Sequence, residues 1–298
     1  MKVVNQTAPI FATDRQHTVI RRLTASDISA VERMIESAWR VSIQFPVQEL
    51  TSKLADLPGL LAEDTVGLRG FVILEPHLPD FGFLAGVGLR DTWHISPFLD
   101  LLLPRLEQTA RGHDLSTLVY IGQTPWLTNE LVQRGFSPHT WVITLERATG
   151  GKILEGATPT QLRPGYLTDL TSITALDAAA FDLVWHKAIG QLAEAITHAD
   201  LFEVAEIDGR PVGYVWAEVC MQQLHLTRLA VLPEYQGRGI GAQLVRRVIA
   251  VAQQRGLKKI SLNTQTDNYR SLALYRRFGF KPTRHKIPML LKRLNQLD

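Results

Sequence analysis

The sequence predicts two α/β (α+β) domains in tandem, each a mixed but mostly antiparallel sheet flanked by helices. Its 298 residues are about twice a common domain length. A glycine-rich segment, ATGGKILEGATP at residues 148–159, follows the strand-like run WVITLER and indicates a boundary near residue 150. Because both sides of this boundary show the same order of motifs, we predict one domain at 1–150 and a second at 151–298.

Each half begins in the same way. A short extended segment, a polar turn and an amphipathic helix occupy residues 20–39 and again residues 160–185. A hairpin pattern follows in each half, at 61–76 and at 206–219. In the second hairpin, Asp208-Gly209 is typical of a tight turn between two strands.

The remainder of each half repeats a strand, a helix, a strand and a short helix. In the first half these are FLAGVGLR, SPFLDLLLPRLEQTARG, LSTLVYIG and the ending LVQRGF. In the second half they are HLTRLAVLP, GIGAQLVRRVIAVAQQRG, KKISLNT and the ending LYRRFGF. We expect each long helix to be stopped by a glycine at the C′ position, where the left-handed conformation is common: Gly112 and Gly256. This order indicates an internal repeat of about 140 residues, with a chance likeness of two α/β domains as the alternative.

Composition narrows the function classes. The formal charge of +3 is small and the basic residues are scattered, so we expect no nucleic-acid partner. A single cysteine, Cys220, excludes an internal disulfide and zinc-type spacing, so we expect no metal site and a reducing, cytoplasmic setting. The start lacks a signal-peptide core, and no run reaches the roughly 18 apolar residues of a spanning helix, so we expect no membrane partner. A homodimer is left open.

The stretch LPEYQGRGIG, residues 232–241, places three glycines at the start of a helix. Glycine costs a helix roughly 0.5–1 kcal/mol relative to alanine. A helix start without side chains leaves its N–H groups uncovered, and these bind phosphate together with the helix dipole. Gly237, Gly239 and Ala242 also satisfy the dinucleotide pattern G-x-G-x-x-A, but PEYQ separates them from the strand and the expected carboxylate is missing. The residues therefore predict a phosphate site and leave its ligand open.

Two motifs of the second half occur together at a specific spacing. The first, Q-x-x-G-x-G, comprises Gln236, Gly239 and Gly241. The second, N-x-x-S-x-x-x-Y-x-x-x-G-F, comprises Asn268, Ser271, Tyr275, Gly279 and Phe280. With both, residues 226–280 resemble the GNAT superfamily of acetyl-CoA-dependent N-acetyltransferases. The resemblance implies acetyl-CoA as co-substrate and direct transfer of its acetyl group, through a tetrahedral intermediate, to a small-molecule or peptide amine.

The resemblance also implies residue roles. The main chain of Leu229, Ala230 and Val231 would pair with the pantetheine arm, and an N–H there would polarise the thioester carbonyl. The pyrophosphate would be held by the loop amides of Gln236, Gly237, Arg238, Gly239, Ile240 and Gly241. Asn268 would contact the coenzyme arm, and Tyr275 would protonate the departing thiolate. From the residues alone, Asn268 could equally be a helix N-cap and Tyr275 a core aromatic.

The proton acceptor for the attacking amine stays open. Where some family members carry a catalytic carboxylate, this chain has His225, whose imidazole can accept a proton near neutral pH. Glu218 on the preceding strand is a second candidate, and water is a third. We expect an aromatic-rich set, which could equally be core, to line the acceptor pocket: Phe181, Trp185, His186 and Trp216.

The first half lacks both motifs. Where the loop should stand it has DTWHISPF, residues 91–98, whose Trp93, His94 and Pro97 would obstruct a pyrophosphate. Leu131 stands near the position of Tyr275. We therefore expect a degenerate first domain and an N-acetyltransferase site in the second. The alternatives are a non-catalytic acetyl-CoA sensor or interaction module, which Tyr275 disfavours, and a dinucleotide-dependent enzyme.

Overall fold

The chain forms two compact units, and the computed structural model describes residues 18–45, 49–77, 79–90, 94–151 and 153–294. Unit 1 comprises Met1–His139 and Pro288–Asp298, and unit 2 comprises Thr140–Ile287. The units therefore divide within the strand before the glycine-rich segment rather than at residue 150. Glycine content marks where a chain turns, whereas strand pairing decides which residues share a sheet.

Unit 1 is built on a mixed sheet. Its strands follow the order β1 (Val19–Arg22), β3 (Gly59–Asp64), β4 (Gly67–His77), β5 (Phe81–Leu89), β6 (Thr117–Ile121) and the end of β13 (Lys281–Arg293). A further strand, β2 (Arg40–Ile43), pairs with β5. β5 and β6 run parallel, whereas β2 and the other neighbours pair antiparallel. The helices are η2 (Ala25–Asp27), α1 (Ile28–Ser37), α2 (Leu50–Asp56), α3 (Ile95–Arg111) and α4 (Pro125–Gln133).

Unit 2 repeats this plan. Its strands follow the order β7 (Ser137–Ala148), β12 (Lys259–Gln265), β11 (Gln223–Val231), β10 (Arg210–Cys220), β9 (Leu201–Ile207) and β8 (Gln161–Pro164). β11 and β12 run parallel, and the other neighbours run antiparallel. The helices are η4 (Leu167–Asp169), α5 (Leu170–Ala180), η5 (Leu183–Trp185), α6 (Ile189–His198), η6 (Pro233–Tyr235), α7 (Ile240–Gln254) and α8 (Tyr269–Arg277).

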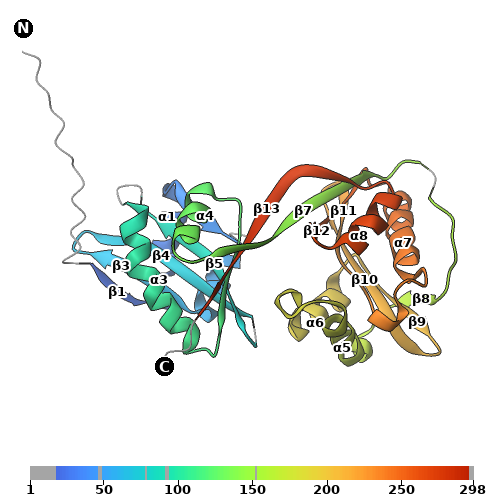
Figure 1. Ribbon diagram of the computed structural model, residues 1–298, viewed down its shortest axis with the longest axis horizontal. Coiled ribbons are helices and arrows are strands. Elements are labelled where there is room, and N and C mark those ends of the chain that lie inside the picture. The colour runs from blue at the N-terminus through green and yellow to red at the C-terminus, as the bar shows by residue number, and fades with distance from the viewer. Residues whose placement is uncertain (1–17, 46–48, 78, 91–93, 152, 295–298) are drawn as a thin grey trace, which may run out of the picture. The chain divides into compact units, whose positions relative to one another are not determined.

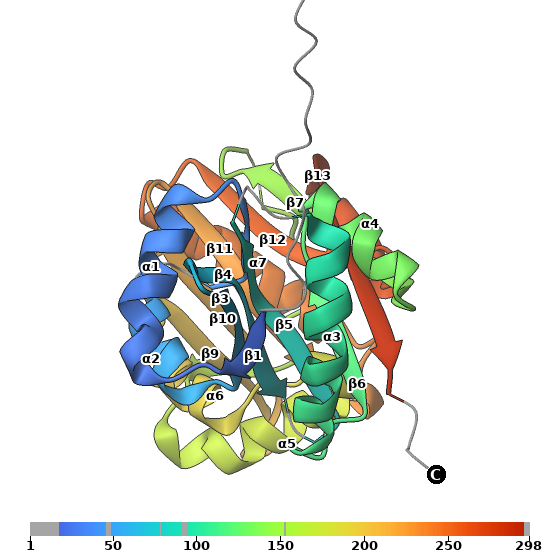
Figure 2. The ribbon, with the colours of Figure 1, turned by 90° about the vertical axis from the view of Figure 1, so that its left-hand side faces the viewer.

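Helices cover both faces of each sheet. In unit 1, α3 and α4 pack on one face around Leu102, and α1 and α2 pack on the other around Val31. Figure 2 shows α1 and α2 on one side of strands β3 to β5 and α3 on the other. In unit 2, α7 and α8 cover one face around Leu244, and α5 and α6 cover the other around Ile173 (Figure 1). The predicted class, mixed sheets flanked by helices, is confirmed.

Strands β7 and β13 each contain residues of both units. Residues Met289–Arg293 of β13 pair antiparallel with β6 in unit 1. Residues Val142–Ala148 of β7 pair antiparallel with β12 in unit 2. The end of the second sequence half therefore completes the sheet built by the first half, a pairing between residues far apart in the chain.

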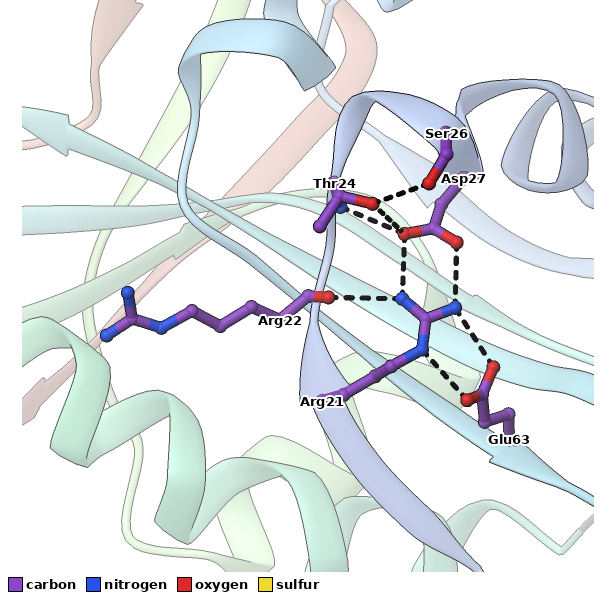
Figure 3. A network of polar contacts seen from close by, with 6 residues as sticks. All are labelled: Arg21, Arg22, Thr24, Ser26, Asp27 and Glu63. Atoms are coloured by element: carbon purple, nitrogen blue, oxygen red, sulfur yellow. Dashed lines mark hydrogen bonds and ion pairs between the residues drawn. The ribbon is translucent and has the colours of Figure 1, made fainter.

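An ion-pair network of the same form occurs in both units. In unit 1, Arg21 donates to both oxygens of Asp27 at 2.7 Å, and to Glu63 at 2.8 and 3.0 Å (Figure 3). The bonds from Arg21 hold the pKa of Asp27 below its usual range. The corresponding residues pair in unit 2: Arg163 donates to both oxygens of Asp169 at 2.8 Å and, through one bond, to Glu206 at 2.6 Å. This shared arrangement supports the internal repeat that the order of sequence motifs indicated.

The turn predictions can be checked against backbone angles. Asp208 and Gly209 adopt φ values of +48° and +75°, so the predicted tight turn is confirmed. Gly256 is left-handed, with φ of +65°, as expected after α7. Gly112 is right-handed, with φ of −66°, so that prediction is wrong; Asp114, two residues later, takes the left-handed conformation instead. Within the described ranges, the helices are all too short or too polar to span a bilayer.

Candidate functional site

A pocket of about 620 Å³ lies in unit 2, within the size range of small-molecule sites. The end of β11, the glycine-rich loop, the start of α7, one face of α8 and the end of α5 form its walls. Most of the predicted coenzyme-binding residues line it: Leu229, Ala230, Val231, Gln236, Gly237, Gly239, Ile240, Gly241 and Asn268. The structure thus brings the loop, the strand and the first residues of the later motif, Asn268 and Ser271, to one place.

Two different features of the structure explain why the loop has glycine at three positions. Gly237 and Gly239 adopt φ values of +80° and +88°, a region that other residues rarely adopt. Gly239 is also the N-cap of α7, and as a glycine it places no capping side chain over this helix start. A Cβ atom on Gly241 would lie 3.2 Å from a methyl carbon of Leu274, so this glycine allows α8 to pack closely on α7. The first-turn N–H groups of α7 are therefore left uncovered at the pocket, as phosphate binding requires.

Two amide side chains order the loop and the start of α8. Gln236 Nε2 donates to the Val231 carbonyl at 2.9 Å and so ties the loop to the end of β11. Asn268 Oδ1 accepts from Ser271 N at 3.1 Å and is the N-cap of α8. Asn268 is therefore a helix N-cap, the alternative role considered for it from the sequence, and it also lines the pocket.

Among the residues that the structure describes, β12 pairs with the first part of β11 and not with its end beside the pocket. The parallel register of β11 with β12 runs from Gln223 to Leu226. A bulge follows at Thr227. Trp216 of β10 pairs with Arg228 and Ala217 pairs with Leu226, so Thr227 between them is the extra residue of β11. Bulges often occur beside active sites, where they end the pairing and redirect the chain. Backbone groups after the bulge are therefore available to an extended ligand at this edge.

The sequence reasoning missed one wall of the pocket. Arg270, Leu274 and Arg277 lie on one face of α8 and line the pocket. Their i, i+4, i+7 spacing is a signal that could have found them. The two arginines bring positive charge to the wall. Arg238, in the loop, is not part of the lining, and its guanidinium carbon lies 5.0 Å from the centre of the Tyr235 ring.

Tyr275, the predicted thiolate acid, lies in the core of unit 2. Its side chain is 7% exposed and belongs to the apolar cluster between α7, α8 and the sheet, with the Phe280 ring edge-on at 5.7 Å. Burial raises the pKa of Tyr275 well above its ordinary value. Tyr275 is absent from the pocket lining, although Leu274 and Ser271 on the same helix are part of it.

The two candidates for the proton acceptor face each other on neighbouring strands. His225 of β11 is opposite Glu218 of β10, and its Nδ1 lies 2.9 Å from Ser261 Oγ. Burial lowers the pKa of His225, and the charge of Glu218 only partly opposes this, so the imidazole is neutral at pH 7. Glu218 is exposed and accepts a hydrogen bond from Trp216 Nε1 at 3.1 Å. Both residues lie outside the pocket lining.

Of the four aromatic residues predicted to line an acceptor pocket, one lines the pocket described above and three do not. Phe181, directly after α5, lines the pocket. Trp185 and His186 follow in the next segment, where His186 Nε2 lies 2.9 Å from the Phe181 carbonyl. Trp216 is 8% exposed and belongs to the core beneath α5 and α6. The core role left open for Trp216 is thus the observed one.

In unit 1, strand β2 occupies the edge of β5 that is equivalent to the edge of β11 beside the pocket. β5 pairs with β6 from Phe81 to Phe83, and a bulge follows at Ala85, as one does at Thr227 in β11. Past the bulge, Gly86–Leu89 pair with β2. If the two bulges are matched, these residues correspond to Arg228–Val231. The equivalent of the Tyr275 position, Leu131, is fully buried, and Trp93 lies outside the described residues.

The second unit is similar in sequence to known acetyltransferases. Residues 170–280 match the model of the Acetyltransferase (GNAT) family. A mycothiol acetyltransferase of Jonesia denitrificans is 29% identical over 208 residues, covering 61% of this chain and 64% of that protein, slightly less than two thirds of its length. A mouse protein, N-acetyltransferase family 8 member 3, is 34% identical over 106 residues, covering 34% of this chain and 47% of its own.

Solved structures share the whole fold. A GCN5-related N-acetyltransferase from Sphaerobacter thermophilus aligns with a TM-score of 0.64 at 15% identity, over 94% of this chain and 96% of that chain. A tandem GNAT protein from the clavulanic acid biosynthesis pathway aligns with a TM-score of 0.63 at 13% identity, over 94% and 100%. At these identities the likeness concerns the fold of the two units. Residues 170–280 of unit 2, which contain both motifs, thus match the GNAT acetyltransferase family, and the two units together have the fold of tandem GNAT structures.

Proposed function

We propose that this chain is an acetyl-CoA-dependent N-acetyltransferase whose site lies in unit 2. The observation that carries the proposal is one pocket lined by both the bare start of α7 and the unpaired end of β11. The α7 start suits the pyrophosphate of the coenzyme. The strand edge suits the amide groups of the pantetheine arm, as it would suit an added peptide strand. Arg270 and Arg277 supply charge that complements the phosphates.

The proposed reaction moves two protons. The acetyl group comes from the thioester: the amine nitrogen forms the C–N bond, the C–S bond breaks, and the thiolate leaves. We assign the amine proton to His225, because burial keeps the imidazole neutral and able to accept it. We assign the proton for the thiolate to Tyr275, the position that the family resemblance gives to this acid, on the helix whose Ser271 and Leu274 line the pocket. Glu218 suits the first role less well, because it is exposed and already accepts a bond from Trp216.

A titration and a screen test this proposal. We expect acetyl-CoA to bind in isothermal titration calorimetry and NAD not to bind. A thiol-release assay over a library of amines should then show turnover with at least one acceptor. The acceptor is a small-molecule or peptide amine, and small amines come first because a relative is named for mycothiol. NAD binding without acetyl-CoA binding would contradict the proposal. Acetyl-CoA binding without thiol release from any amine would favour the sensor alternative.

The number of coenzyme sites gives a separate prediction. We expect one molecule of acetyl-CoA per chain, because β2 pairs with the edge of β5 that corresponds to the free edge of β11. The stoichiometry of the same titration measures this number. Two bound molecules per chain would contradict the inference that β2 occupies, in unit 1, the strand edge that the coenzyme arm occupies in unit 2.

A further inference from the structure

A buried ion pair lies beside the pocket, and the proposed reaction does not use it. Asp177 on α5 is 1% exposed, and Arg228 on β11 is 9% exposed. Arg228 Nε donates to Asp177 Oδ1 at 2.8 Å, and Nη2 donates to Oδ2 at 2.7 Å. The Tyr214 hydroxyl donates to Oδ1 at 2.5 Å, and Lys187 N donates to Oδ2 at 3.0 Å. Each carboxylate oxygen therefore accepts two hydrogen bonds.

Fold stability alone does not account for this pair. Burying two charges costs solvation energy, and well-packed apolar residues of similar volume often stabilise a core as well. What a satisfied buried network does provide is a fixed geometry. Arg228 stands one residue before Leu229, where β11 begins to line the pocket. A fixed geometry at this point therefore affects what the pocket can accept.

The ion pair reaches the pocket wall through Phe181. The guanidinium carbon of Arg228 lies 3.4 Å from the centre of the Phe181 ring. Arg228 Nη2 also donates to the Trp185 carbonyl at 2.8 Å, so the segment after α5 is held at both ends. Phe181 lines the pocket, whereas Asp177, Arg228 and Tyr214 do not. The ring is thus a wall residue whose position depends on the ion pair behind it.

The position of Phe181 along the pocket points to its role. With the pyrophosphate at the loop, the coenzyme arm would follow β11 backward from Val231 to Leu229. The acyl end would then meet the wall beside Arg228, which Phe181 forms. Resting on the proposed function, we propose that Phe181 limits the length of the acyl group, and so selects acetyl over longer acyl groups. Asp177 and Arg228 are positioning residues that act through the ring.

Binding of an acyl-CoA series tests this without an acceptor. Affinities for free CoA, acetyl-CoA, butyryl-CoA and hexanoyl-CoA would be measured by calorimetry for the natural chain and for Phe181→Ala. An apolar pocket discriminates by on the order of tenfold for a misfit methylene. We therefore expect hexanoyl-CoA to bind the natural chain at least about tenfold more weakly than acetyl-CoA. In Phe181→Ala we expect this ratio to fall to about threefold or less, with free CoA affinity unchanged.

A matched control uses another phenylalanine of the same core. Phe202 is 7% exposed and its ring stacks on Tyr214 at 5.4 Å, yet it does not line the pocket. Phe202→Ala should keep the acyl-length ratio of the natural chain. Asp177→Asn should lower the ratio in the same direction as Phe181→Ala, because Arg228 loses its charged partner. Phe181→Leu provides a milder variant should the alanine variant not fold in a thermal unfolding scan.

The outcomes separate this inference from the proposed function. A folded Phe181→Ala variant with an unchanged ratio overturns the role of the ring, as does an equal fall of the ratio in Phe202→Ala. An unchanged ratio in a folded Asp177→Asn variant overturns the positioning role of the ion pair. Failure of the natural chain to bind any CoA compound would instead contradict the acetyl-CoA site itself.

Discussion

Replacing Gly239 by leucine is expected to lower the affinity for acetyl-CoA by about 100-fold, the largest effect on binding that we expect from one residue. Gly239 has a φ of +88°, caps α7 and lines the pocket, so a side chain there would cover the N–H groups of the helix start. A hydrogen bond to a charged group contributes about 1.5–3 kcal/mol, and about 1.4 kcal/mol corresponds to tenfold in affinity. Loss of one or two such bonds to phosphate accounts for the size of the effect. Calorimetric titration with acetyl-CoA measures it.

The matched control for this variant is Gly256→Leu at the other end of the same helix. Gly256 is also left-handed, at +65°, and apart from its chain neighbours the described residues leave the place of its Cβ open to 4 Å. Both substitutions impose a left-handed strain of about 1–2 kcal/mol on the fold, which thermal unfolding can compare. Only the Gly239 variant should lose coenzyme affinity. Natural affinity in a folded Gly239→Leu protein would mean that the loop is merely a connection between β11 and α7.

The parts of the site that could be predicted from the sequence depend on local signals. Three glycines between an apolar strand and an amphipathic helix indicate a bare helix start, and the structure places Gly237, Gly239 and Gly241 at a pocket, although Gly241 is explained by helix packing rather than by a positive φ. The hairpin turn at Asp208-Gly209 was predictable for the same reason, since its conformation depends on the residues themselves. The internal repeat could be recognised in the sequence because turns and helix ends of the same kind recur in the same order in both halves.

The parts that could not be predicted depend on pairing between distant residues. Nothing in Arg40–Ile43 indicates that it pairs with β5, and nothing in Met289–Arg293 indicates a partner in the first half. The bulge at Thr227 is likewise invisible in a run of alternating residues, yet it decides which groups face the pocket. Asp177 and Arg228 are separated by many residues of ordinary helix and strand, so their contact has no sequence signal.

Changing Tyr275 to phenylalanine is expected to lower turnover by about 100-fold while leaving acetyl-CoA affinity nearly unchanged. Proton transfer by a positioned side chain contributes typically 10²- to 10⁴-fold, and phenylalanine keeps the ring that packs on Phe280. Turnover would be followed by thiol release with the amine found in the screen. Because burial raises the pKa of Tyr275, its hydroxyl remains protonated from pH 7 to pH 9.5, where an ordinary tyrosine of pKa near 10 begins to ionise. The loss on substitution should therefore be equally large at both pH values.

The competing role of Tyr275, a core aromatic, makes the opposite prediction for the same measurements. A core hydroxyl affects the free energy of unfolding and leaves turnover intact, so full activity in Tyr275→Phe would contradict the assignment as thiolate acid. Tyr120→Phe is a suitable control, since Tyr120 is fully buried in unit 1 and loses the same hydroxyl. If both variants lose similar stability but only Tyr275→Phe loses turnover, the loss must come from chemistry at the coenzyme. The side chain is 7% exposed and outside the pocket lining, so the proton would reach the thiolate only where α8 faces the pocket, beside Ser271 and Leu274.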